Sequence, residues 1–302
     1  MHFITLVLAL LCQDSFELKY GTGKTTSEPV EVTGGLEISI EGKGAIVDYV
    51  RMSHPIFSLQ KVKYRMEGEY QGTGKDRHKI AGYRASVEGM YDDEEYEREY
   101  SILNPPKNLG EDMFELIIWA MSMGPHTFTR YDNGSFLNDD PNQDAYGEVL
   151  TLYSTGTIRI PTVPVTVGES WTSRWTTTRK QKDNRGRFRL VQKATLMKVE
   201  TRKGREIAFI DAKMTGTLHA PDEKKNPGEE TWAKTEGWMK LELDLETGRV
   251  LRNEGEGKVH NYYKGTDPGT GKESKLDLIF RSWGTYRAKN AMKKTPSRKK
   301  DY

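Results

Sequence analysis

The chain has 302 residues, and its 46 Lys and Arg against 44 Asp and Glu leave a formal net charge of +2 at pH 7. This near balance excludes a protein-wide basic field of the kind that attracts nucleic acid. Charged residues make up 30% of the chain and hydrophobic ones 35%, so the apolar core is thin for this length. Such a composition suits antiparallel sheets with one face in water, and the length allows two lobes.

The N-terminus predicts a secreted or periplasmic location rather than a cytoplasmic one. Residues 3–12 form an apolar run of the length of a signal-peptide core, too short to span a bilayer, so residues 1–15 are predicted to be a signal peptide. A buried first strand or helix is the alternative, because only Met1 and His2 precede the run and no small-residue cleavage site follows. Cys12, the only cysteine, could carry a lipid anchor, although Leu11 stands where such signals usually carry a small residue.

Residues 16–160 are predicted to form an N-terminal β-rich lobe. Residues 36–41 alternate strictly between apolar and polar, residues 45–50 are predicted to be a strand after a Gly42-Lys-Gly44 turn, and residues 57–70 and 79–91 alternate more loosely. The acidic run at residues 92–97 is interpreted as a solvated edge or loop rather than a cation site.

One amphipathic helix is predicted at residues 108–123, packed on a sheet as a lid or plug. Asn108 is a good N-cap, and Gly124-Pro125 ends the pattern. Its apolar face would carry Met113, Leu116, Ile117, Ala120 and Met121. A hairpin turning at Asp132-Asn133-Gly134 and a short helix at residues 142–153 should follow.

Residues 161–288 are predicted to form a C-terminal antiparallel meander. Five segments, at residues 187–200, 206–218, 231–245, 250–262 and 275–286, are separated by turn-forming clusters. From Met239 to Leu245 apolar and charged residues alternate without exception, and Gly248 is expected to take a positive φ in the next turn. The predicted fold class is therefore mainly β: two lobes of long antiparallel curved sheet, as a half-barrel or a sandwich, with the helix near 108–123.

The segments Ile160-Pro161, Pro164-Val165, Val167-Gly-Glu-Ser-Trp171 and Glu246-Thr-Gly-Arg-Val250 carry a resemblance to a known family. Over roughly residues 150 to 286 the chain resembles a family of secreted bacterial proteins of unknown function with a Val-x-Val-Gly-Asp/Glu-Ser-Trp motif. That family is architecturally similar to the curved half-barrels of periplasmic lipoprotein carriers. The resemblance implies a fold, and it assigns no catalytic residue.

Motifs for nucleotide, metal and hydrolytic chemistry are weak. Gly21-Thr-Gly-Lys-Thr25 looks like part of a phosphate-binding loop, but Leu18 stands where the first Gly is required, and the same tetrapeptide recurs twice in turn-like contexts. The oxygen-rich residues 138–144 lack the Gly and Glu of a calcium loop, and the histidines are too far apart for a paired zinc motif. Ser170 lacks a recognisable base, whereas a carboxylate pair assembled by folding stays open. We predict no cofactor, metal or nucleotide.

Tryptophans suggest a binding function instead. Trp171 and Trp175 are expected on one face of a strand, and Trp238 on the charged face of another. With Met113, Leu116 and Ile117 they define a candidate cavity for an apolar ligand, and indoles that only fill the core are the alternative. Residues 289–302, with six Lys or Arg, are predicted to be a disordered basic tail that could attach to an anionic envelope surface, with no role for nucleic acid.

Three functional hypotheses therefore stay open. The first is a non-enzymatic envelope protein that binds a hydrophobic ligand or a lipoprotein inside a curved sheet. The second is a secreted structural or protein-interaction module whose interior is filled by its own side chains. The third is an enzyme whose carboxylates converge only on folding.

Overall fold

The computed structural model describes residues 14–21, 27–53, 55–72, 77–103, 113–124, 126–138, 145–178, 186–219, 229–267 and 269–289. The predicted signal peptide with Cys12, residues 108–112 of the predicted helix, nearly all of the loop at 138–144 and all of the tail beyond Lys289 lie outside these ranges. The strands are β1 (Ser15–Phe16), β2 (Ser27–Lys43), β3 (Leu59–Gly72), β4 (Arg77–Tyr91), β5 (Glu94–Ser101), β6 (His126–Arg130), β7 (Phe136–Asn138), β8 (Val165–Thr166), β9 (Ser170–Thr176), β10 (Arg187–Arg202), β11 (Arg205–His219), β12 (Glu230–Asp244), β13 (Val250–Thr266) and β14 (Glu273–Ala288).

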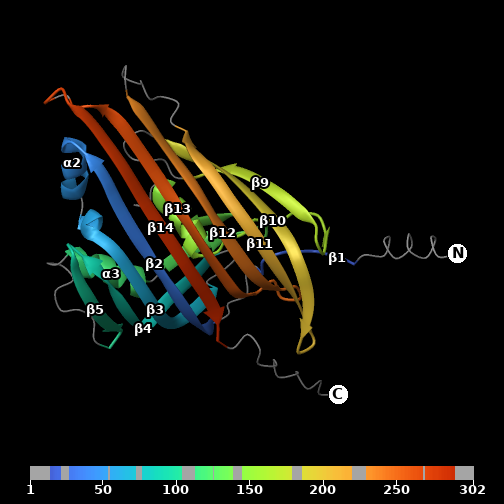
Figure 1. Cartoon of the computed structure of the whole chain (residues 1–302). Helices are drawn as coiled ribbons and strands as arrows, with labels where there is room; N and C mark the ends of the chain where they lie inside the picture. The colour runs from blue at the N-terminus through green and yellow to red at the C-terminus, as the bar shows by residue number, and fades with distance from the viewer. Residues whose placement is uncertain are drawn as a thin grey trace, which may run out of the picture.

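A single antiparallel sheet dominates the protein, which confirms the mainly β prediction. Its strand order is β7-β6-β4-β3-β2-β14-β13-β12-β11-β10-β9, and β5 also pairs with β4. We call β2 to β7 the first strand block and β9 to β14 the second. The two blocks are joined through β2 and β14, for example at Glu37 opposite Arg281. Figure 1 shows the long strands side by side in a strongly twisted, curved sheet. Of the arrangements left open by the sequence, the curved open sheet is the one formed.

The two faces of this sheet differ in the way the alternation predicts. Met239, Leu241 and Leu243 of β12 are buried, whereas Lys240 between them is exposed. We call the face that carries Met239 the inner face and the face that carries Lys240 the outer face. The inner face holds two apolar clusters, one centred on β10–β13 and one on β2–β4, so each strand block contributes a core of its own.

Helices cover the inner face. They are α2 (Ala45–Ser53), the short 3-10 helix η1 (Pro55–Ser58), α3 (Met113–Met123) and α4 (Ala145–Ser154). The helix α4 confirms the prediction at residues 142–153, and α3 confirms the described part of the helix predicted at residues 108–123. Within α3, Ile118 is fully buried against the β2–β4 cluster.

The strand predicted at residues 45–50 is wrong, because these residues form the start of α2. Ile46, Val47 and Val50 follow helical spacing and pack against the second cluster, while Tyr49 and Met52 on the opposite side are 67% and 80% exposed. A short β-branched run cannot be assigned by periodicity alone, and here packing on β2 and β14 decides for helix.

The predicted turns at residues 132–134 and at Gly248 are confirmed, whereas the predicted Gly42-Lys-Gly44 hairpin turn is wrong, because Gly42 and Lys43 belong to β2 and α2 follows after Gly44. Asp132, Asn133 and Gly134 connect β6 to β7, and Gly248 has φ +66°. In the acidic run, Asp92 and Asp93 form the turn between β4 and β5, and residues 94–97 begin β5, which pairs with β4 and with no other described strand. This run is a solvated edge, as predicted.

Candidate functional site

Trp171 and Trp175 lie together on the inner face at the β9 edge. They stand opposite Ala194 and Leu190 of β10 and are half-buried against the first cluster. The Trp171 Nε1–H donates a hydrogen bond of 2.8 Å to the backbone oxygen of Arg159, and the Arg159 guanidinium lies 4.1 Å from the centre of the Trp175 ring. These contacts tie the segment before β8 to the sheet.

Trp238 lies on the outer face, opposite Lys213, and is 37% exposed. The sheet therefore separates Trp238 from Trp171 and Trp175. The remaining predicted cavity residues, Met113, Leu116 and Ile117, belong to α3, but their side chains lie outside the described part of the structure.

The centre of the inner face is occupied by the end of α4. Glycines of three neighbouring strands, Gly237 of β12, Gly255 and Gly257 of β13 and Gly284 of β14, form a surface without side chains under this helix. A methyl group at any of them would overlap Tyr153 or Ser154. The Tyr153 hydroxyl reaches Thr235 Oγ1 at 2.9 Å and the Met214 backbone oxygen at 3.3 Å, so it is satisfied in the interior. The end of α4 therefore fills the space over this part of the inner face.

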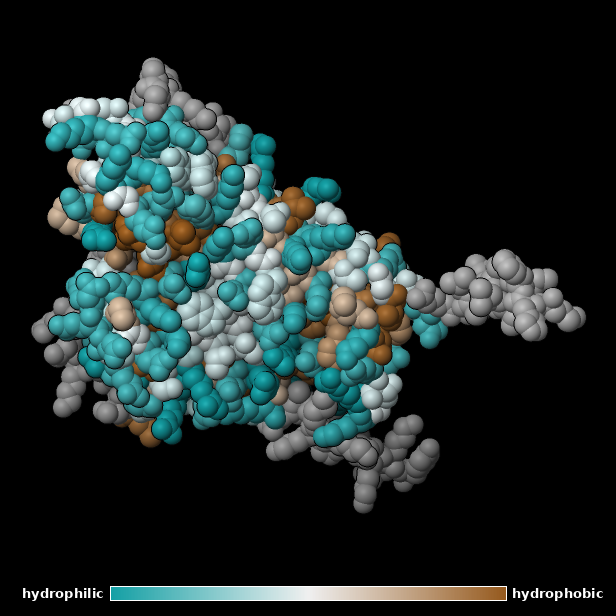
Figure 2. All heavy atoms as spheres, in the orientation of Figure 1, coloured by the Kyte–Doolittle hydropathy of each residue, from teal (hydrophilic) through white to brown (hydrophobic). Residues whose placement is uncertain are grey.

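Beside α2, apolar side chains from three parts of the chain pack against the second cluster but are only half-buried. We call this set the apolar mouth: Ile40 of β2, Ile46 and Val50 of α2, Phe57 of η1 and Phe280 of β14. The rings of Phe57 and Phe280 lie 6.2 Å apart in a tilted arrangement. Figure 2 shows brown, apolar atoms gathered in the recess beside α2.

A buried polar cluster lies where β2, β14 and the β12–β13 turn meet. Glu28 of β2, 7% exposed, forms an ion pair with Arg249 and accepts a hydrogen bond of 3.0 Å from the Tyr286 hydroxyl. Burial raises the pKa of Tyr286, so this phenol stays protonated and can donate. Residues 258 positions apart in sequence are joined here, which makes the cluster a structural link between the two ends of the chain.

His78 of β4 extends this cluster. It stacks between Tyr70 and Phe128, with ring centres 5.6 and 5.3 Å away, and its Nδ1 is 2.5 Å from the Tyr70 hydroxyl. Burial, followed by the charge of Arg130, lowers the pKa of His78 from 6.5 to about 4, so the imidazole is neutral at neutral pH. The Arg130 guanidinium in turn lies 4.6 Å from the centre of the Tyr20 ring.

The described residues offer little for metal or nucleotide chemistry. Among them, no group of three or more His, Cys, Asp and Glu side chains could hold a metal ion. The third Gly-Thr-Gly-Lys copy is a turn in which the Asp267 carboxylate accepts hydrogen bonds from the backbone of Gly269 and Thr270. The first two copies fall mainly outside the described ranges. None of the described helices is both long and apolar enough to cross a membrane.

Sequence reasoning missed both the apolar mouth and the buried polar cluster. Helical spacing of Ile46 and Val50 could have signalled the mouth. The polar cluster had no local signal, because its members come from segments far apart in the sequence. Neither the known protein families nor the curated proteins contain a match to this sequence.

Proposed function

We propose that the protein is a non-enzymatic protein of the cell envelope that binds a hydrophobic ligand, an acyl chain of a lipid or a lipoprotein, at the apolar mouth. One observation carries the proposal: half-buried apolar side chains from β2, α2, η1 and β14 gather in one place beside α2, while the centre of the inner face is filled. Grouped apolar surface of this kind marks a binding site more often than scattered apolar residues do.

The energetics favour an apolar chain over a polar ligand. Each Å² of apolar surface removed from water contributes on the order of 25 cal/mol, and an acyl chain would cover side chains that water now touches. The five mouth residues carry no charge, so ligand specificity would come from shape rather than from ion pairs. Secretion, suggested by the apolar N-terminal run, would bring the protein to lipids of the envelope.

A second candidate is a structural or interaction module with a filled interior. The packing of Tyr153 on the glycine surface favours it, because the space that a large ligand would need inside the curved sheet is taken by the chain itself. In this case the half-buried mouth residues would only complete the packing of α2.

Titration of the full chain with a fluorescent fatty acid separates the two candidates. Wild type should bind the probe saturably, and Ile46→Glu, which places a carboxylate in the mouth, should weaken binding at least tenfold. Tyr49→Glu is the matched control on the same helix, since Tyr49 is 67% exposed and faces away. Thermal unfolding of both variants verifies that α2 stays folded. Absence of saturable binding by wild type would exclude the ligand-binding proposal and leave the filled module.

A further inference from the structure

Four cationic side chains lie close together on the outer face of β9, β10 and β11. They are Arg174, Arg189, Lys193 and Lys213, which we call the basic patch, and all four are exposed. Lys193 stands directly opposite Lys213 in the β10–β11 register, and Arg174 stands opposite Val191. Within the described ranges, no carboxylate forms an ion pair with any of the four.

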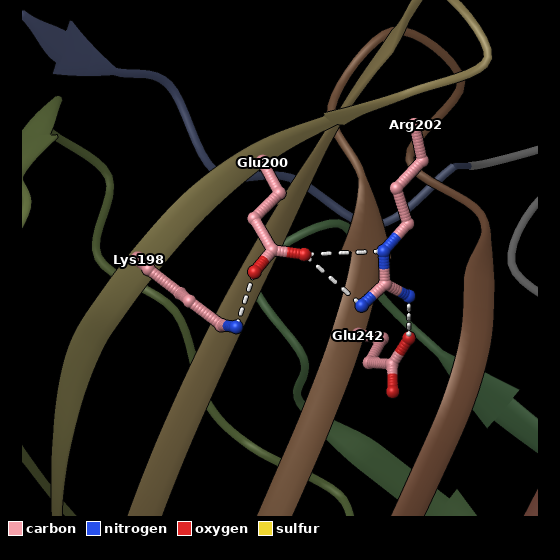
Figure 3. A network of polar contacts seen from close by, with 4 residues as sticks. All are labelled: Lys198, Glu200, Arg202 and Glu242. Carbon is pink, nitrogen blue, oxygen red and sulfur yellow. Dashed lines mark hydrogen bonds and ion pairs between the residues drawn. The ribbon is translucent and has the colours of Figure 1, made fainter.

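Several other cations of the outer face are neutralised by neighbouring carboxylates. At the lower end of β10 and β12, Glu200 contacts both Lys198 and Arg202, and Arg202 reaches Glu242 at 2.9 Å (Figure 3). Further along the sheet, Lys258 pairs with Glu236 at 2.8 Å and Lys63 with Glu88 at 3.0 Å. The basic patch differs from these ion-paired positions because it groups four exposed cations that form no ion pair within the described part of the chain.

Two like charges directly opposite each other on adjacent strands destabilise a sheet. Lys193 and Lys213 form such a like-charged pair, and Trp238 of β12 lies next to Lys213 in the same cross-strand row. With strands about 4.8 Å apart, this row of three residues spans roughly 10 Å. An anion placed over the row would remove the repulsion. The electrostatic potential of four clustered cations would also attract anionic partners before contact.

The patch combines charge with exposed apolar surface. Val191 and Trp238, each 37% exposed, lie beside the lysines. Cations beside an exposed indole suit the interface of a membrane, where Trp sits at the level of the headgroups and Lys or Arg meet the phosphates. A single exposed tryptophan offers no succession of stacking platforms, which single-stranded nucleic acid would use.

We propose that the outer face of β9–β12 docks on an anionic phospholipid surface through the basic patch and Trp238. This docking surface lies on the opposite face of the sheet from the apolar mouth, and the proposal does not depend on ligand binding there. It differs from attachment through the C-terminal tail, because it assigns the contact to folded strands.

Co-sedimentation of the full chain with vesicles tests the proposal. The protein should bind vesicles of phosphatidylcholine and phosphatidylglycerol in equal parts and release them at high salt, but should not bind pure phosphatidylcholine. Lys193→Gln with Lys213→Gln should weaken binding by about tenfold or more, since each cation near an anionic surface contributes roughly fivefold in affinity. Because the substitutions remove a repulsion at exposed positions, the unfolding midpoint should stay the same or rise.

The matched control is Lys63→Gln with Lys258→Gln, which makes the same change in net charge at cations that are ion-paired. This variant should bind vesicles within about twofold of wild type, because Debye screening limits the effect of distant charges. Equal losses in the two double variants would overturn the proposal, as would binding that survives in the patch variant and disappears when residues 290–302 are removed. A single-stranded oligonucleotide could instead bind more tightly than anionic vesicles at the same salt, and lose this binding in the patch variant. That result would overturn the proposal and identify nucleic acid as the ligand of the basic patch.

Discussion

The ring of Tyr153, at the end of α4, lies directly on the backbone of Gly257 in β13, so closely that a methyl group on the glycine would overlap the ring. Helices usually meet a sheet through side chains on both sides. Here the strand contributes only backbone, which lets α4 sink into the concave face. The contact holds the helix against the sheet and closes the middle of the interior.

Gly257→Val should therefore lower the free energy of unfolding by about 1 to 3 kcal/mol or more, because the new side chain must displace Tyr153. Urea denaturation monitored by circular dichroism measures the loss. Gly269→Ala, in an exposed turn, is the control and should have little effect. An unchanged midpoint for Gly257→Val would show that α4 does not rest on this glycine.

Gly248 combines a positive φ with a close approach of the N-terminal segment. Its φ is +66°, its carbonyl accepts a hydrogen bond of 2.6 Å from Gly21, and a methyl group here would overlap the Gly21 backbone. Gly204 has a similar φ of +80°, but no atom lies within 4 Å of a methyl group added there. Gly204→Ala should cost about 1 kcal/mol from backbone strain alone, and Gly248→Ala at least about 1 kcal/mol more. Equal losses in chemical denaturation would mean that the Gly21 contact is absent.

His78 should make stability depend on pH in the acidic range. The pKa of His78 is about 4 in the folded protein, below its unfolded value of 6.5, so the folded state binds fewer protons between these values. The contribution is complete above pH 6.5 and is lost as the pH falls towards 4, at up to about 1.4 kcal/mol per pH unit and roughly 2 to 3 kcal/mol in total. Urea midpoints across this range measure it. In His78→Phe, which keeps the stack between Tyr70 and Phe128, the slope should be smaller; an identical slope would contradict the assignment to His78.

Glu28 and Arg249 should show coupled effects on stability. Removing either partner leaves a partly or wholly buried charge without its counterion, so Glu28→Ala and Arg249→Ala should each destabilise the protein by about 2 kcal/mol or more. The double variant should lose less than the sum of the two, with a coupling energy of about 1 to 3 kcal/mol. Additive losses in a double-mutant cycle would indicate that the two side chains act independently.

The apolar run at residues 3–12 predicts that a signal peptidase cleaves the chain near residues 13–16. The pairing of Ser15 and Phe16 with Thr166 and Val165 leaves the folded contacts intact if cleavage falls just before β1. Mass spectrometry of the protein purified from its native source should find a chain that begins near residues 13–16 or, if the protein is a lipoprotein, one that begins at a lipidated Cys12. An intact residue 1–12 segment in a cytoplasmic fraction would end the secretion hypothesis.

Local patterns in the sequence were sufficient for most individual elements. The alternation of Met239 to Leu245 predicted which side chains of β12 are buried, because a strand places successive residues on opposite faces whatever its neighbours are. Gly248 could be assigned a positive φ for a similarly local reason. In contrast, the pattern of residues 45–50 predicts a strand where a helix forms, since a short β-branched run fits both a strand and a helix until its packing partner is known.

Only the tertiary structure decided which strands are neighbours and what lies on them. Strand register decides the pairing of β2 with β14, the contact of Glu28 with Tyr286 across 258 residues and the position of Lys193 opposite Lys213. The sequence of one strand does not indicate which strand it will pair with. The apolar mouth and the glycine surface under Tyr153 arise in the same way. Alternation in a single strand determines its buried face, but a site forms only when several strands and helices meet, and that arrangement is set by the packing of the whole chain.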